Sequence, residues 1–300
     1  MEHTYIDRIR KIAGAEAVFA DEIMAPHMSM KVGGPADCFV KPKEAAAVGP
    51  LVKFLKEESI PYYVIGNGSN VIIRDEGYRG VIICIKEGLR EVSIEGTTVH
   101  AGAGISLKDL ADIVCAASLT GFEFASGIPG SLGGAVTMNA GAYDGEMKNV
   151  IRSVEAVDKD GNAVTFTAEE ADFSYRHSAF SAGDYIITGA VLELAEGKHD
   201  EIQAKMDDLN RRRADKQPLE YPSCGSTFKR PEGHFAGKLI MDSDLAGARV
   251  GGASVSAKHC GFVINDQNGT AEDVLGVIAM VQKTVKEKFG IELECEVKVL

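Results

Sequence analysis

The stretch ASGIPGSLGGAVTMNAGAYDG, residues 125–145, constrains the fold more than any other part of this sequence. Six of its 21 residues are glycine. Because glycine loses more conformational freedom on folding than other residues, this density favours loops in which the backbone must approach something closely. The side chains of Ser131 and Asn139 add small polar groups. We therefore expect a ligand-binding segment here.

A second glycine loop, residues 66–70 (GNGSN), lies upstream between two apolar strand-like segments. Its backbone N–H groups can form an anion-binding nest. It is not a Rossmann fingerprint, because the third glycine is missing and the chain continues as a strand. Alone it is as well explained by a tight turn. Together, the two loops predict one phosphate-bearing cofactor held from two sides, by Gly66, Asn67, Gly68, Ser69, Asn70, Gly127, Ile128, Pro129, Gly130, Ser131, Gly133, Asn139 and Gly141.

Hydrophobic periodicity and turn residues indicate mixed helices and strands along the chain. Ser106 is the expected cap of a helix, with Asp109 as its acidic partner, and Asp160-Gly161 is expected to form a hairpin turn. A domain boundary is expected near Glu196, which divides the chain into 1–196, with lobes 1–85 and 86–196, and 197–300. We expect helices over 4–20, 44–58, 106–119, 200–213, 235–244 and 270–289, and a last strand over 291–300.

Composition excludes several classes of protein. With 44 acidic and 32 basic side chains, the formal net charge is −12, which argues against binding to nucleic acid or to an anionic membrane. The six cysteines are scattered without a CxxC pair, so neither a disulfide scaffold nor a metal site is expected. No signal peptide and no apolar run of roughly 20 residues is visible, so we expect a cytoplasmic protein without membrane insertion.

Eight motifs, in order, resemble those of one family, the UDP-N-acetylenolpyruvoylglucosamine reductases, also called UDP-N-acetylmuramate dehydrogenases. They are VIGNGSN (64–70), SGIPGSLGGAV (126–136), NAGAYDG (139–145), FSYRHS (173–178), CGSTFKRP (224–231), AGKLI (236–240), KHCGFVIN (258–265) and LECEV (293–297). The resemblance runs from about Ser29 to Val299. It implies an α+β fold, with a two-lobed FAD-binding domain of the vanillyl-alcohol oxidase type and a C-terminal α/β substrate-binding domain.

The same resemblance implies an activity. FAD is bound noncovalently, and hydride passes from NADPH to flavin N5 and then to UDP-N-acetylglucosamine enolpyruvate, giving UDP-N-acetylmuramate for peptidoglycan synthesis. No obligate protein partner is evident. A related FAD oxidoreductase acting on another small substrate, or a flavin-binding protein without catalysis, is the alternative. Residues 177–180 run almost directly into the next strand, so the chain resembles the shorter type that lacks a tyrosine-bearing insertion.

Three residues are implied as catalytic. The planar guanidinium of Arg176 suits a carboxylate, and the resemblance implies that it holds the enolpyruvyl carboxylate. Ser226 is implied as the proton donor. Strand alternation would put Glu294 and Glu296 on one face, so the residues alone do not choose between them. The family pattern selects Glu296.

Further residues are expected near the substrate. Tyr143 and Tyr175 are expected as pocket neighbours, and Lys216 and Arg230 flank the Ser226 loop, where they can neutralise a diphosphate. For the two cations, solvated surface charge is the alternative. Arg230 occupies a place that is often asparagine in relatives. Cys224 is a rival nucleophile next to this loop, but we expect it to be a bystander.

Overall fold

The structure is a computed structural model that describes residues 4–300. Its helices are α1 Thr4–Ala13, α2 Val48–Glu57, α3 Leu107–Ala116, α4 Leu132–Thr137, α5 His199–Lys216, α6 Ala236–Asp242 and α7 Ala271–Phe289. Its strands are β1 Val18–Ile23, β2 Pro35–Val40, β3 Tyr62–Ile65, β4 Val71–Ile72, β5 Tyr78–Cys84, β6 Val92–Glu95, β7 Thr98–Gly102, β8 Leu119–Thr120, β9 Gly141–Ala142, β10 Gly145–Glu146, β11 Ile151–Asp158, β12 Ala163–Thr167, β13 Tyr185–Glu193, β14 Ala195–Glu196, β15 Arg249–Val250, β16 Ala253–Val255, β17 Val263–Asn265 and β18 Lys298–Val299.

The chain divides into two compact units, each built from separate stretches of sequence. Unit 1 comprises Met1–Asp21, Asp37–Asn67 and Arg79–Arg212, and unit 2 comprises Glu22–Ala36, Gly68–Tyr78 and Arg213–Leu300. The sequence suggested one boundary near Glu196 instead. Compact units and functional domains need not coincide, so the assignment of 1–196 and 197–300 stays a prediction.

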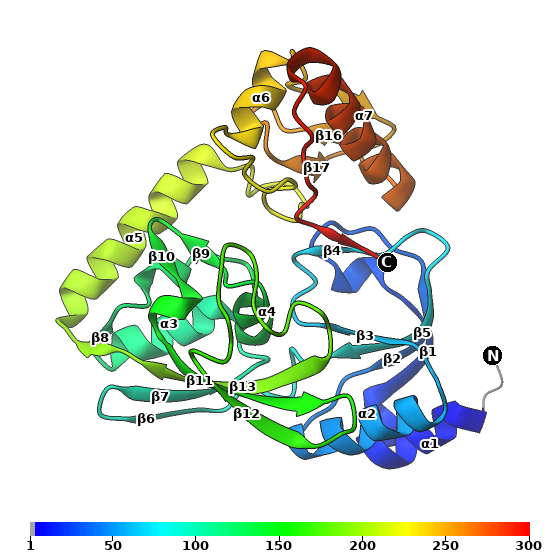
Figure 1. Cartoon of the computed structure of the whole chain (residues 1–300), viewed down its shortest axis with the longest axis vertical. Coiled ribbons are helices and arrows are strands. Elements are labelled where there is room, and N and C mark those ends of the chain that lie inside the picture. Colours follow the sequence, from blue (N-terminus) through cyan, green and yellow to red (C-terminus); the bar gives the residue numbers. More distant parts are fainter. Residues whose placement is uncertain (1–3) are drawn as a thin grey trace. The chain divides into compact units, whose positions relative to one another are not determined.

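A four-stranded sheet in the order β1-β2-β5-β3 belongs mainly to unit 1. Strands β3 and β5 run parallel, with Tyr62 opposite Val81 and Ile65 opposite Cys84. Helix α2 buries Val48, Leu51, Val52 and Leu55, which recur at helical spacing, and lies beside α1 (Figure 1). Since β3 ends at Ile65, this sheet sets the position of the first glycine loop.

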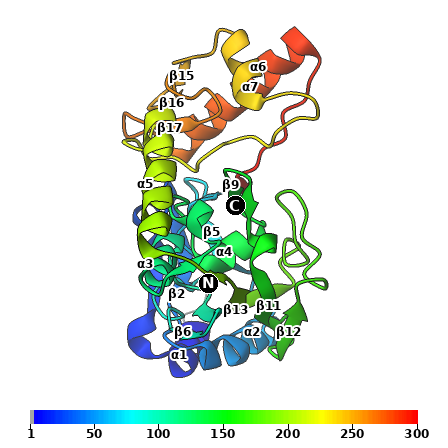
Figure 2. The same ribbon diagram turned by 90° about the vertical axis from the view of Figure 1, so that its left-hand side faces the viewer.

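Unit 1 also contains a five-stranded antiparallel sheet in the order β12-β11-β13-β7-β6. The turn at Asp160-Gly161 joins β11 to β12, as the sequence predicted. Helix α4 packs on β13. Helix α3 lies next to α5 (Figure 2). This packing fixes the second glycine loop, because α4 begins inside it.

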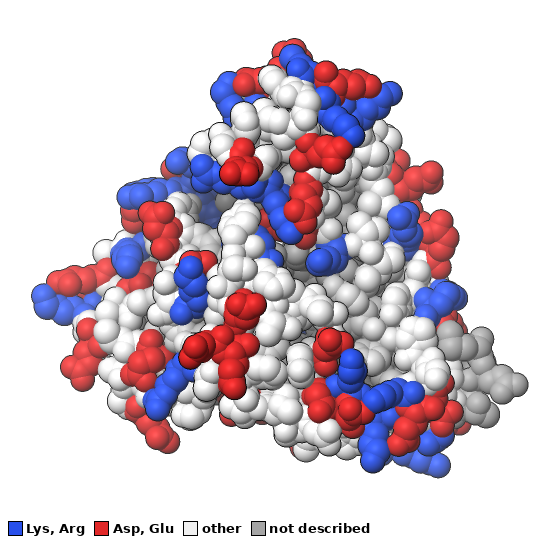
Figure 3. Space-filling view, viewed as in Figure 1, with Lys and Arg blue, Asp and Glu red and all other residues white. Residues whose placement is uncertain are grey.

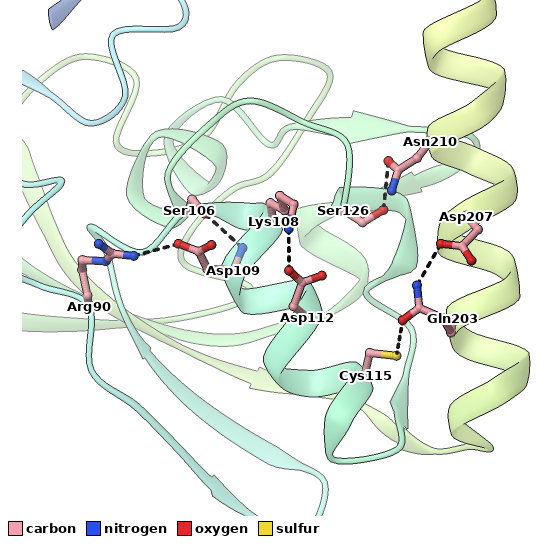
Figure 4. A network of polar contacts seen from close by, with 10 residues as sticks. All are labelled: Arg90, Ser106, Lys108, Asp109, Asp112, Cys115, Ser126, Gln203, Asp207 and Asn210. Atoms are coloured by element: carbon pink, nitrogen blue, oxygen red, sulfur yellow. Dashed lines mark hydrogen bonds and ion pairs between the residues drawn. The ribbon is translucent and has the colours of Figure 1, made fainter.

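Helix α3 begins as expected, but one of its polar contacts differs from the expectation. Ser106 Oγ accepts a hydrogen bond from the backbone N–H of Asp109 at 3.0 Å. The Asp109 carboxylate accepts a hydrogen bond from Arg90 at 2.7 Å, so it turns to Arg90 and not to the cap (Figure 4). Two contacts reach α5: the Cys115 thiol of α3 lies 3.7 Å from Gln203, and Ser126, in the loop before α4, lies 3.4 Å from Asn210. These contacts attach the first part of α5 to unit 1.

In unit 2, helices α6 and α7 pack together, and α7 also contacts the three-stranded sheet β15-β16-β17 (Figure 2). Thr270 and Asp273 form a reciprocal capping box at the start of α7, and Gly290, with φ of 71°, ends the helix. Such caps mark helix ends, and the helix expected over 270–289 is confirmed. The loop residue Asp75 adds a carboxylate that accepts the N–H groups of Ala271 and Glu272, each at 2.9 Å.

Two expected elements are wrong in extent. The leading helix stops at Ala13 rather than near residue 20, because Gly14 adopts φ of 91° and β1 begins at Val18. The expected last strand is reduced to Lys298–Val299, and residues 291–297 contribute only one isolated bridge, at Cys295. Glu294 and Glu296 therefore flank a single bridging residue and do not belong to a continuous strand.

Charges of both signs are interspersed on the face drawn in Figure 3, where Lys and Arg side chains alternate with Asp and Glu. No helix within residues 4–300 combines the length and the apolar character needed to cross a bilayer.

Candidate functional site

The two glycine loops meet in unit 1. A Cβ atom built on Gly66 would lie 1.9 Å from Ser131 Oγ and 2.9 Å from Ser131 Cβ. Any side chain at position 66 would therefore collide with Ser131. Glycine is required at this point because the two loops approach each other so closely. The sequence predicted two loops around one ligand, and the structure brings them into contact.

Two buried polar atoms at this junction lack a hydrogen-bond partner in the described structure. They are Ser131 Oγ and Asn67 Oδ1. Ser131 is only 2% exposed. Buried polar groups in native proteins are almost always satisfied by protein, water or ligand. A hydroxyl donor and an amide oxygen acceptor, left open beside two glycine loops, fit a cofactor that carries phosphate and hydroxyl groups, as FAD does.

The second glycine loop forms hydrogen bonds with the segment that leads into α3. Gly130 accepts the N–H of Leu107 at 3.0 Å, and Leu132 donates its N–H to Ile105 at 2.9 Å. A Cβ on Gly133 would lie 3.0 Å from Ala103 Cβ. These contacts set the position of residues 130–133 against the segment before α3.

Asn139 is completely buried (0% exposed), and its side-chain amide forms hydrogen bonds with other groups of the protein. Its Nδ2 donates to Glu146 Oε2 at 2.7 Å and to the Ser174 carbonyl at 3.1 Å, and its Oδ1 accepts the Lys148 N–H at 2.9 Å. The Gly141 carbonyl accepts from Arg176 Nη2 at 3.4 Å. Both residues were expected at the cofactor; their described contacts instead support the turn that carries Arg176, and cofactor contact stays a prediction.

Arg176 occupies a strained turn. Ser174 and His177 exchange backbone hydrogen bonds of 3.1 and 3.2 Å, which leaves Tyr175 and Arg176 at the tip. Arg176 has φ of 55°, a left-handed conformation that costs about 1–3 kcal/mol for a residue other than glycine. Its guanidinium lies 5.1 Å from the centre of the Tyr175 ring. Such strain is typical of functional positions, and the turn presents a half-buried cation.

Tyr143 lies at the tip of the β9–β10 hairpin of unit 1. Tyr143 and Asp144 both have positive φ, 51° and 65°, as a two-residue type I′ turn requires. The Tyr143 side chain is exposed. Its role as a substrate neighbour stays a prediction.

In unit 2 the structure brings together Ser226 and Glu296. Thr227, the residue after Ser226, is buried, and its carbonyl accepts the N–H of Glu296 at 2.8 Å. Thr227 Oγ1 accepts the N–H of Val263 at 3.1 Å, and its own N–H donates to Gly261. Thr227 therefore joins the proposed proton donor to the proposed acid over 70 positions of sequence. Sequence reasoning missed it; the second hydroxyl in the motif CGSTF was the available signal.

The two glutamates of the last segment differ in their surroundings. Glu294 is exposed, with its side chain 69% accessible and 2.5 Å from Lys229 Nζ. Glu296 is half-buried. The backbone alternates across the bridge between Phe228 and Cys295, with Glu294 accepting the Lys229 N–H at 2.9 Å. An exposed ion pair leaves Glu294 poorly suited to chemistry, which favours Glu296.

The remaining candidates, Cys224, Lys216 and Arg230, belong to unit 2. Burial raises the pKa of Cys224 to about 12, so its sulfur is a thiol at neutral pH, as expected of a bystander. Lys216 ends α5 and is exposed. The Arg230 guanidinium lies 4.0 Å from the centre of the Phe235 ring, and its Nε donates to the His234 carbonyl at 3.3 Å. The substrate roles of Lys216 and Arg230 stay predictions.

Comparison with known proteins agrees with this geometry. Two family models match, the FAD binding domain over residues 36–167 and the UDP-N-acetylenolpyruvoylglucosamine reductase C-terminal domain over residues 217–300. A UDP-N-acetylenolpyruvoylglucosamine reductase of Caldanaerobacter subterraneus subsp. tengcongensis is 46% identical over 300 residues, covering 100% of this chain and 99% of the relative. The chain belongs to the UDP-N-acetylenolpyruvoylglucosamine reductase family.

Other members of this reductase family support the assignment. The reductase of Clostridium perfringens is 50% identical over 285 residues, covering 95% of this chain and 93% of the relative. The crystal structure of the enzyme from Thermus caldophilus has a TM-score of 0.79 at 35% identity, covering 93% of this chain and 97% of that one. A glucose dehydrogenase, Phl p 4.0202, has a TM-score of 0.53 at 13% identity over 64% of this chain and 44% of its own, which shows only a shared fold.

Membership of the reductase family confirms several expectations from the sequence. The fold is α+β, with an FAD-binding domain and a C-terminal reductase domain. The protein is an oxidoreductase of the peptidoglycan pathway that uses FAD.

Proposed function

We propose that this enzyme reduces UDP-N-acetylglucosamine enolpyruvate to UDP-N-acetylmuramate, with NADPH as the reductant. The observation that carries the proposal is the hydrogen bond from Glu296 N–H to the Thr227 carbonyl, which sets an exposed serine beside a half-buried glutamate. The relatives named for this reaction match the chain over nearly its whole length. We also propose a cytoplasmic location, where the nucleotide sugar is made, and a division of labour in which 1–196 binds FAD and 197–300 binds substrate.

The FAD site in this proposal uses the junction of the two glycine loops. Ser131 Oγ would donate to the cofactor, and Asn67 Oδ1 would accept from it, which satisfies two buried atoms. Gly66 lets the two loops approach each other because it lacks a side chain, and Gly133 lets the second loop pack against Ala103. When bound, the flavin supplies the hydride-transfer chemistry.

The protein's own residues would then act on the enolpyruvyl group. Arg176 pairs with the carboxylate, where a fixed positive charge stabilises the negative charge that hydride addition creates. Ser226 donates its hydroxyl proton to the carbon next to the carboxylate, and this sets the new stereocentre. Glu296 orients and polarises the same group. Its half-buried position keeps bulk water from competing for it.

Steady-state turnover tests the proposal. Purified enzyme is mixed with NADPH and UDP-N-acetylglucosamine enolpyruvate, NADPH is followed by absorbance, and the product is identified by mass spectrometry. We expect one UDP-N-acetylmuramate formed per NADPH consumed. NADPH oxidation without this product would indicate a related oxidoreductase with another substrate, and flavin binding without NADPH oxidation would indicate a binding protein.

A further inference from the structure

Both backbone groups of Glu296 form hydrogen bonds within unit 2, one to a backbone carbonyl and one to a side-chain amide. Its N–H donates to the Thr227 carbonyl at 2.8 Å, and its carbonyl accepts from Asn70 Nδ2 at 3.1 Å. The first bond places the residue relative to Ser226. The second comes from the last residue of the first glycine loop, 226 positions away in sequence.

Asn70 also holds the residues that follow Glu296. Its backbone carbonyl accepts the Lys298 N–H at 3.0 Å, which begins the parallel pairing of β18 with β4. The Leu300 N–H then donates to Ile72 at 2.9 Å, and the Arg74 N–H to Leu300 at 2.9 Å. The terminal segment is thus hydrogen-bonded to residues 70–74. Among these bonds, the one from the Asn70 side chain reaches Glu296 itself.

The amide group is the chemistry that this position requires. A carbonyl oxygen needs a donor, and Asn supplies one from Nδ2, whereas the isosteric Asp is an acceptor at neutral pH. A half-buried carbonyl that loses its donor leaves the peptide free to rotate or to seek water. The Glu296 carboxylate would move with that peptide, because both belong to one residue.

We propose that Asn70 is a positioning residue for the reduction of substrate: its side-chain amide fixes the Glu296 peptide and thereby aims the Glu296 carboxylate. This rests on the proposed function of Glu296. It gives the glycine loop a second task, since the loop expected to bind the cofactor also orders a residue for the half-reaction with substrate. Asn70 acts through Glu296 and does not itself touch the reacting atoms.

Variants Asn70→Ala and Asn70→Asp of the FAD-loaded enzyme test the proposal by rapid mixing. Because Asn70 is also expected at the cofactor, FAD content and NADPH-driven bleaching are measured for each variant, and the loss in reoxidation is judged relative to them. Flavin reoxidation by UDP-N-acetylglucosamine enolpyruvate should slow by about tenfold, because a misplacement of the order of 1 Å costs up to 10²-fold. Asn70→Asp keeps the size but not the donor, so it should be at least as slow as Asn70→Ala. If Asn70→Asp matches the parent, the donor is unimportant and the proposal is wrong.

A double-mutant comparison shows whether Asn70 acts through Glu296. In a Glu296→Gln enzyme, adding Asn70→Ala should slow reoxidation no further, because residues that act as a unit are not additive. Independent, multiplicative effects would overturn the proposal. So would equal slowing of both half-reactions together with loss of FAD, since Asn70 would then serve only the cofactor.

Hydrogen exchange supplies a readout that does not depend on activity. Amides of residues 296–298 should exchange about fivefold faster in Asn70→Ala, the effect of one net hydrogen bond. Gln282→Ala is the matched control, because Gln282 Nε2 donates to the Leu293 carbonyl of the same segment at 2.9 Å. That variant should loosen residues near 293 and keep reoxidation within about twofold. Unchanged exchange in Asn70→Ala refutes the positioning role, whereas normal reoxidation in Glu296→Gln alone refutes the proposed function of Glu296.

Discussion

At the scale of single residues, Ser226 and Thr227 have different roles: the first is proposed to react, and the second holds the loop. Ser226 is exposed in a loop, while its neighbour Thr227 is buried and carries the hydrogen bonds that hold the loop. A substitution at Ser226 can therefore remove a hydroxyl without disturbing the backbone. This division makes the proposed proton transfer open to a direct test.

Ser226→Ala should leave reduction of the flavin by NADPH nearly unchanged and slow reoxidation by the enolpyruvyl substrate. Loss of a general acid typically costs about 10²-fold or more. Stopped-flow absorbance at the flavin band measures each half-reaction separately. Ser223→Ala, three residues earlier in the same loop, is the control and should change neither rate. Equal losses in both half-reactions would mean that the substitution disturbs the fold or the flavin.

Glu296→Gln and Arg176→Ala should each slow substrate reduction by about 10²-fold, the size of general-acid and electrostatic contributions. Glu294→Gln should change it little, because the Glu294 carboxylate is exposed and paired with Lys229. The reoxidation rates of the three variants show which glutamate acts on the substrate, and flavin content checks that each variant folds. A crippled Glu294→Gln beside a near-normal Glu296→Gln would show that the family pattern is displaced by two residues.

At the scale of elements, the glycine loops are structured by what surrounds them. The first loop follows a parallel strand of the four-stranded sheet, and the second is bonded to the segment before α3 and starts α4. Each scaffold is local, yet the contact between Gly66 and Ser131 forms only when both are packed. The junction is thus a tertiary feature of unit 1.

Gly66→Ala should weaken FAD binding, because its new Cβ would lie 1.9 Å from a buried hydroxyl. Overpacking of this kind costs about 1–3 kcal/mol, and 1.4 kcal/mol is tenfold in Kd, so we expect a loss of about tenfold or more. Gly134→Ala is the matched control, since its Cβ would meet Ser131 Oγ at an ordinary 3.5 Å. Fluorescence titration of apoenzyme with FAD gives both constants. Equal affinities in the two variants would mean that the junction is not the cofactor site.

At the scale of the whole molecule, two compact units are each assembled from three stretches of chain. The final residues of the chain pair with β4 in unit 2, and Asp75 caps α7 there. Residues 68–78, which follow the first glycine loop and contain β4, thereby contact both the end of the chain and the start of α7. The Asn70–Glu296 hydrogen bond also joins residues 68–78 to the C-terminal segment of the chain.

The purified enzyme should be yellow and should release its FAD when denatured. The open groups at the loop junction are a hydroxyl and an amide oxygen, which bind by hydrogen bonds and form no covalent flavin link. Absorbance of the filtrate after acid precipitation measures the released flavin, and mass spectrometry of the precipitate measures any that remains. Flavin retained on the denatured chain, or no flavin bound after reconstitution, would contradict this expectation.

The sequence by itself determined the local features and the family. Local patterns predicted α2, α3 and α7, and Ser106 was the expected cap of α3 because its side chain acts on a backbone group three residues away. Ordered motifs indicated the reductase family and its FAD. Only the tertiary structure decided that Gly66 faces Ser131, that Thr227 and Asn70 hold Glu296, and that Glu294 is a surface ion pair. Periodicity failed at 291–297 because this segment is shaped by bonds to distant residues, and such long-range contacts leave no local pattern in the chain.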